Sequence, residues 1–185
     1  MNLDPIVVHQ IFGALIAAFA VFMLLREIAS LGERWADYLS AAALLFVGAL
    51  LFADPWLFHG GDFGVEGHQH SLQGLLAVAA GTLEAYRVRR KSEHFLFLLV
   101  IPAVLAAIGI GFLRHHQHAT GDMLLQTVQH RIMGATLLLA AVVKLAANFR
   151  WRDGQWARAG WLLILLAFSL QLLLYAEVPG HAGHG

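Results

Sequence analysis

The histidines are the residues of this chain best suited to chemistry. The sequence contains eleven His and no Cys. The lack of Cys excludes disulfides, thiolate zinc sites, Fe–S clusters and a cysteine nucleophile. Imidazole, by contrast, binds zinc, copper and haem iron. The composition therefore directs attention to a metal or haem site, provided that the fold brings several histidines together.

Three histidines recur at nearly equal spacing, 61 and then 60 residues apart: His9, His70 and His130. Each is followed four residues later by a glycine: Gly13, Gly74 and Gly134. A small residue also follows each of these histidines after 39 residues: Gly48, Gly109 and Ser169. Because residues i and i+4 share one face of a helix, each His should sit directly above its Gly. The spacing predicts three related helical hairpins.

Three imidazoles that meet around the axis of such repeats would suit zinc or copper and leave one position open. Further candidate ligands lie near them in the repeat: His68, His115, His116, His118 and Asp54. Asp54, His115 and Tyr175 hold equivalent positions, each 45 residues after a repeat histidine. A carboxylate at such a position would be a ligand or the hydrogen-bond partner that fixes an imidazole tautomer.

Two alternatives stay open. Two of the repeat histidines could hold one haem b, or one of them a chlorophyll, while Gly13, Gly74 and Gly134 leave room for the flat macrocycle. The chain would then be a subunit of a membrane electron-transfer complex. It could also be a structural accessory subunit whose small residues pack against a partner. No G-x-S-x-G, P-loop or H-E-x-x-H sequence is present, so we predict no catalytic residue.

The composition places these histidines in a membrane protein. Of the 185 residues, 59% are hydrophobic and 13% are charged, against the usual ~25% charged in soluble domains. A formal net charge of zero excludes a nucleic-acid binder that works through a basic field. A bilayer is crossed by about 20 apolar helical residues. Six segments qualify: 5–25, 35–53, 69–86, 94–113, 123–147 and 156–176.

Charge asymmetry predicts the orientation. Ten of the twelve Lys and Arg residues lie at or between the ends of spans 1–2, 3–4 and 5–6. The positive-inside rule therefore places both termini outside, on the periplasmic face of a bacterial inner membrane. We expect one membrane domain over 1–185, with repeats at about 5–60, 66–118 and 122–177 and a flexible His/Gly tail at 178–185. The tryptophans should form an aromatic belt at the span ends: Trp35, Trp56, Trp151, Trp156 and Trp161.

The leading hypothesis is a membrane protein that binds a metal ion at a histidine site near the periplasmic face. Copper is preferred to zinc because nitrogen ligands bind Cu(II) more tightly. The expected partners are the lipid bilayer and either a periplasmic metal carrier or a larger membrane complex, with no nucleic acid. Glu84 and Lys144 lie toward the cytoplasmic ends of the third and fifth spans. Their side chains should extend to the interface, with pairing across the bundle as the alternative.

Overall fold

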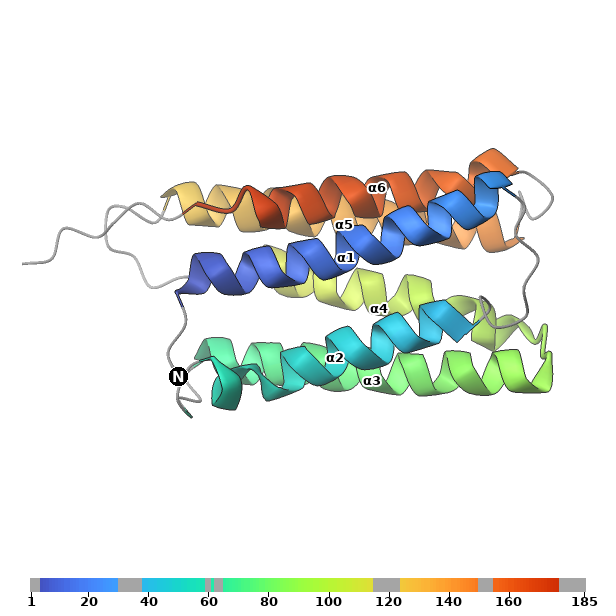
Figure 1. Cartoon of the computed structure of the whole chain (residues 1–185), viewed down its shortest axis with the longest axis horizontal. Helices are drawn as coiled ribbons and strands as arrows, with labels where there is room; N and C mark the ends of the chain where they lie inside the picture. Colours follow the sequence, from blue (N-terminus) through green and yellow to red (C-terminus); the bar gives the residue numbers. More distant parts are fainter. Residues whose placement is uncertain are drawn as a thin grey trace, which may run out of the picture.

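The fold of the chain is all-helical over the residues that the computed structural model describes, which are 4–29, 38–58, 61, 65–114, 124–149 and 155–176. Six helices occur there: α1 Pro5–Ala29, α2 Leu39–Leu57, α3 Val65–Arg90, α4 Phe95–Arg114, α5 Leu124–Phe149 and α6 Gln155–Leu173. Successive helices run in opposite directions, so α1 begins and α6 ends at the same end of the bundle (Figure 1). The predicted all-α class is confirmed.

The start of α1 agrees with the sequence prediction, whereas several other helix ends differ. Asp4 caps the helix by accepting a hydrogen bond from the Ile6 backbone N–H at 2.8 Å, and Pro5 is the first helical residue. The helix α3 is longer than its predicted span, since it begins at Val65 and continues to Arg90. Polar residues extend such a helix beyond its apolar segment because backbone hydrogen bonding carries on into the interface. Conversely, α2 begins at Leu39, four residues later than predicted.

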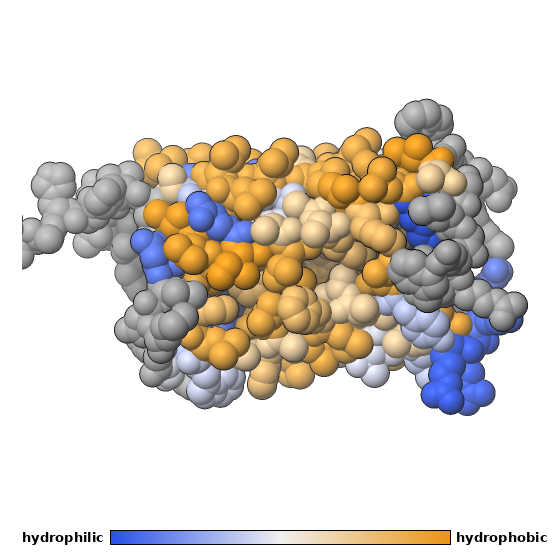
Figure 2. All heavy atoms as spheres, in the orientation of Figure 1, coloured by the Kyte–Doolittle hydropathy of each residue, from blue (hydrophilic) through white to orange (hydrophobic). Residues whose placement is uncertain are grey.

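Four of the helices, α1, α2, α4 and α5, are long and apolar enough to cross a membrane. The helix α3 carries histidine, glutamine and charged side chains that lower its apolar content, and the apolar part of α6 is shorter, at Arg158–Leu173. Large apolar side chains such as Leu72, Leu124 and Leu174 are more than half exposed. An apolar surface covers the middle of the bundle in the view of Figure 2. Such a surface is suited to contact with lipid.

The six helices form a ring in which each helix contacts two neighbours and α1 closes on α6. The most extensive contacts join α2 to α3, α4 to α5 and α1 to α6. Contacts between the helices of each predicted hairpin are sparser, and those between α1 and α2 are the sparsest of all. Each of the odd-numbered helices therefore packs mainly on an even-numbered helix of another hairpin.

The glycines of the H-x-x-x-G sequences lie at these three close contacts. A Cβ atom at Gly13 would come within 3.0 Å of the Ser169 carbonyl oxygen. At Gly74 it would meet the Phe52 backbone nitrogen and lie 2.6 Å from the Gly48 carbonyl oxygen. At Gly134 it would lie 2.7 Å from the carbonyl oxygen of Gly109. The three glycines and their small partners therefore allow close helix packing, and neighbouring backbone fills the space that a macrocycle would need.

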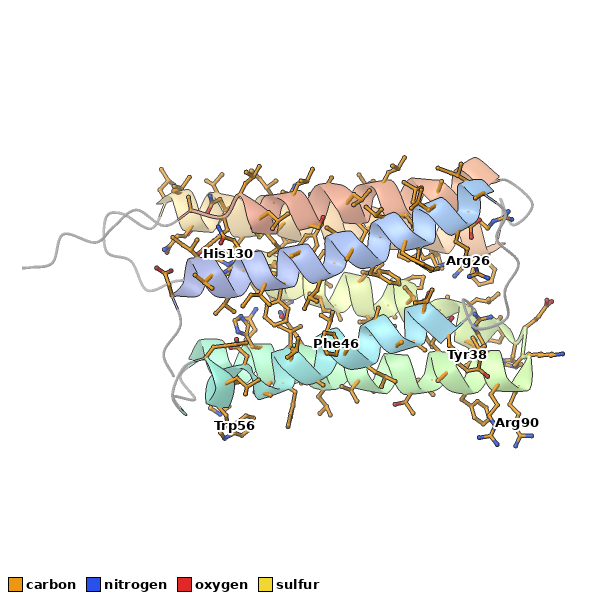
Figure 3. All side chains as sticks on the ribbon, viewed as in Figure 1. Arg26, Tyr38, Phe46, Trp56, Arg90 and His130 are labelled. Carbon is orange, nitrogen blue, oxygen red and sulfur yellow. The ribbon has the colours of Figure 1, made fainter. Side chains whose placement is uncertain are left out.

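The two ends of the bundle differ in chemistry. We call the end where α1, α3 and α5 begin the histidine end and the opposite one the basic end. His130 and Trp56 lie at the histidine end, while Arg26 and Arg90 lie at the basic end (Figure 3). Trp56 is 51% exposed, as an aromatic belt requires. The belt prediction is wrong for Trp161, which is 4% exposed and packs in the interior. Trp35, Trp151 and the side chain of Trp156 lie outside the described residues.

Candidate functional site

A cavity of about 160 Å³ runs along the axis of the helix ring and is lined by residues of all six helices. The even-numbered helices contribute lining residues 31, 35, 38 and 42 positions after each repeat histidine. The level nearest the basic end consists of Ser40, Ile101 and Trp161, and the level nearest the histidine end consists of Leu51, Phe112 and Leu172. We call this space the axial cavity. Its walls are almost entirely apolar.

Two of the repeat histidines line one end of the axial cavity, and the third contacts one of them. His9 and His70 both line it. His130 is 5% exposed, and its ring centroid lies 6.0 Å from that of His9, with the rings 71° apart. The structure thus brings His9 and His130 into contact, while His70 faces the same cavity as His9 from another helix.

Two aromatic side chains complete the surroundings of this pair. The ring of Tyr175 stacks on His9 with a centroid distance of 3.9 Å and lies 5.7 Å from His130. The ring of Phe112 stacks on His130 with a centroid distance of 5.6 Å. Phe112 was not a predicted site residue, because a phenylalanine in an apolar span has no signal that separates it from ordinary packing. The two aromatic rings restrict how the imidazoles can turn.

Hydrogen bonds fix the tautomers of two repeat histidines. His70 Nδ1 lies 2.8 Å from Asp54 Oδ2, and the Asp54 side chain is fully buried. His130 Nδ1 lies 2.8 Å from the Gln126 carbonyl oxygen. A carboxylate and a carbonyl oxygen can only accept, so each Nδ1 carries the hydrogen and each neutral ring presents the lone pair of Nε2. Metal-binding histidines commonly have this second hydrogen bond.

The other predicted ligands are not brought to this site in the part of the chain described. His68 is exposed and does not line the axial cavity. His115, His116 and His118 lie outside the described residues, as does the tail at 178–185. Among the residues that are described, no group of three His, Cys, Asp or Glu side chains is arranged to hold a metal ion. The site as observed is the pair of imidazoles of His9 and His130, with His70 lining the same cavity as His9.

A second cavity, of about 140 Å³, lies at the basic end, and we call it the inner cavity. Glu84 accepts hydrogen bonds from Arg87 at 2.8 and 2.6 Å, and Arg158 donates to Glu27 at 2.8 Å. Lys144 Nζ lies 4.7 Å from the Trp161 ring centroid. The expectation that Glu84 extends to the interface is wrong, because its side chain is 4% exposed and bonded inside the bundle. Lys144 likewise lines the inner cavity.

Comparisons with models of protein families, with curated proteins and with solved structures found no match to this chain. The functional argument therefore depends on the chemistry and the geometry of the two cavities.

Proposed function

We propose that the chain is a six-span protein of a bacterial inner membrane, composed of three quasi-equivalent hairpins around the axial cavity, with both termini periplasmic. Three observations support the repeat. Each H-x-x-x-G glycine packs on a small residue of equivalent position, and the cavity lining recurs at equal offsets. In addition, the residue 45 positions after a repeat histidine contacts another repeat histidine in two cases, Asp54 with His70 and Tyr175 with His9.

We further propose that the protein binds a transition-metal ion, copper before zinc, at the histidine end. The observation that carries this proposal is the 6.0 Å separation of the His9 and His130 rings. Two imidazoles that share one ion have centroids roughly 5–6 Å apart, because each metal–nitrogen distance is about 2.0–2.1 Å. The observed separation lies at the upper end of this range. His70, which Asp54 holds in the metal-binding tautomer, would supply a third nitrogen from across the cavity.

Titration of the purified protein with Cu(II) and with Zn(II) tests this function. The full-length chain should carry His181→Ala and His184→Ala, so that the tail does not add its own sites. We expect one tightly bound ion per chain and a higher affinity for Cu(II). If neither Cu(II) nor Zn(II) binds more tightly than it does to an unrelated membrane protein, the proposal is wrong.

Asp54→Asn should weaken Cu(II) binding by about 10- to 100-fold, the usual cost of losing a partner that orients a metal ligand. The amide keeps the size of the side chain but loses the negative charge that faces His70 at 2.8 Å. Asp4→Asn is the matched control, because Asp4 is exposed at the same end and asparagine caps a helix equally well. An unchanged affinity in Asp54→Asn would show that the charge of the Asp54 carboxylate does not support metal binding.

Metal binding should depend on pH through the histidines. Protons compete with the ion for the Nε2 lone pairs, so the affinity falls as the pH is lowered. A Cu(II) titration repeated between pH 5 and 8 measures this dependence. An affinity that stays constant across this range would indicate that carboxylate or backbone oxygens, rather than imidazoles, hold the ion.

Haem b is the second candidate, because His9 and His70 face one apolar cavity from two helices. The axial cavity, at about 160 Å³, is smaller than the roughly 300–1,000 Å³ of ordinary ligand pockets, so the ring of helices would have to widen. A Soret band in the purified protein would favour haem, or its chlorophyll counterpart, over a bare ion. The same histidine site would bind the ion if the chain is a metal-bearing subunit of a larger complex. It would also do so if the chain receives its ion from a periplasmic metal carrier. If the chain is instead a structural accessory subunit, neither an ion nor a pigment should bind.

A further inference from the structure

We propose that the bundle also binds a single-chain lipid anion, with its head group in the inner cavity and its hydrocarbon chain in the axial cavity. The best-matched class is a long-chain carboxylate. This inference does not depend on the metal site, because the head group would bind at the opposite end of the bundle and the chain would contact the apolar walls of the axial cavity rather than its histidines.

The inner cavity has the charge that an anionic head group requires. Its lining contains four cationic side chains and two carboxylates: Arg26, Arg87, Lys144, Arg158, Glu27 and Glu84. Among the described residues that line the cavity, cationic side chains outnumber carboxylates by two. Like charges in such a site repel each other and are costly to remove from water, so a bound anion stabilises the arrangement. Guanidinium and ammonium groups bind carboxylates and phosphates through charge-assisted hydrogen bonds.

The two cavities adjoin, which favours one molecule with a polar head and an apolar chain. Ser40, Ile101 and Trp161 line both cavities. On one side of these residues the walls carry charged groups, and on the other side they are formed by leucine, isoleucine and phenylalanine. A ligand that passes this level would have its charge at Arg26 and Lys144 and its methylene groups along the axial cavity.

The elongated shape of the axial cavity favours a single acyl chain. On α2 the lining extends from Ser40 to Leu51, and this segment is about 16 Å long at about 1.5 Å per residue. That length is about half of the ~30 Å hydrocarbon core of a bilayer, which is the depth that one acyl chain fills. A volume of about 160 Å³ over such a length leaves a narrow space. The space suits a slender chain rather than a two-chain phospholipid or a flat ring system.

The sparse contact between α1 and α2 provides a way in from the bilayer. These two helices also supply ten of the residues that line the axial cavity, including Phe12 and Ile16 on α1 and Ala43 and Val47 on α2. A lipid of the leaflet at the basic end would enter with its head group already at the level of the inner cavity. The bound molecule would therefore keep the orientation that it has in the membrane.

Fluorescence of Trp161 provides the readout for a binding test. The full-length protein in non-ionic detergent is titrated with hexadecanoic acid brominated close to the carboxylate, because bromine quenches a nearby indole. We expect saturable quenching that Trp161→Phe removes, and little quenching by the methyl ester of the same acid. An ester that quenches Trp161 as strongly as the acid would overturn the role of the charge.

Two matched pairs of variants test the head-group and chain sites separately. Lys144→Gln should weaken binding of the acid about tenfold, whereas Lys91→Gln, at an exposed lysine on the same end, should bind like the original protein. Ala43→Phe should abolish binding by filling the axial cavity, whereas Ala42→Phe places the same ring on the exposed face. Circular dichroism establishes that both variants are folded. Wild-type binding of the acid by both Lys144→Gln and Ala43→Phe would then overturn the proposal.

Competition distinguishes the two sources of this chemistry. Displacement by unlabelled hexadecanoate at a lower concentration than by a single-chain phosphate ester of equal length identifies a carboxylate, and the reverse order identifies a phosphate. Either order supports a single-chain anion, whereas displacement by neither overturns it. Cu(II) titration of Lys144→Gln should be unchanged, so the failure of one proposal leaves the other standing.

Discussion

Replacing His9 and His130 together with alanine should lower the affinity for Cu(II) by at least 100-fold. The two rings are 6.0 Å apart and within contact of one aromatic side chain, Tyr175. Removal of both takes away two of the three proposed nitrogen ligands. Loss of even a supporting residue costs about 10- to 100-fold in metal affinity, so loss of two ligands should cost more. Isothermal titration of the detergent-purified protein measures the change directly.

The control for this pair is His94→Ala. His94 is exposed near the start of α4, at the basic end, and lines neither cavity. Its removal should leave Cu(II) affinity unchanged when the tail histidines have been replaced in all samples. If His94→Ala and the His9/His130 double variant lose affinity equally, binding is distributed over scattered imidazoles and the proposed site does not exist.

Gly74→Ala should destabilise the fold by about 2–3 kcal/mol, the upper part of the range for forcing extra atoms into a packed interior. The added methyl group would meet the Phe52 backbone nitrogen and lie 2.6 Å from the Gly48 carbonyl oxygen. Backbone cannot turn aside as a side chain can, so α2 and α3 must move apart. The same movement separates His70 from Asp54, whose 2.8 Å contact joins these two helices.

Gly160→Ala is the comparison for that effect. The nearest atom to a Cβ at Gly160 is Val143 Cγ1 at 3.5 Å, an ordinary contact, and alanine favours helix more than glycine does. Its stability should therefore be equal to or slightly above that of the original protein. Unfolding in mixed micelles, followed by circular dichroism, measures both variants. Equal losses of stability in Gly74→Ala and Gly160→Ala would show that close packing at Gly74 does not hold α2 to α3.

The helices could be predicted from the sequence, and so could the end of the bundle at which the repeat histidines lie. Both depend on residues that are close together in the chain. Apolar length determines a span, and Asp4-Pro5 marks the start of α1 by the ordinary chemistry of a helix cap. The register of the histidines likewise follows from spacing alone. Such signals need no knowledge of which helices become neighbours.

Helix pairing and the second cavity could not be predicted in this way. The sequence spacing suggested hairpins, yet α3 packs chiefly on α2 and α1 on α6. Glycine at i+4 was equally compatible with space for a macrocycle and with close packing, and only the position of Phe52 decides for Gly74. Trp161 and Glu84 resemble interface residues in the sequence. They are buried because residues of several other helices surround them, and such contacts have no local signal.

X-ray absorption of the protein loaded with one equivalent of Cu(II) tests most directly whether His9 and His130 hold one ion. Imidazole gives a nitrogen shell at about 2.0 Å with a characteristic outer-shell scattering from the ring. We predict this signature, with two or three imidazoles per copper, in the chain that carries the tail substitutions. We also predict its loss in the His9→Ala/His130→Ala variant. An identical imidazole signature in that variant would contradict the account, because the ion would then be bound without the pair of histidines on α1 and α5.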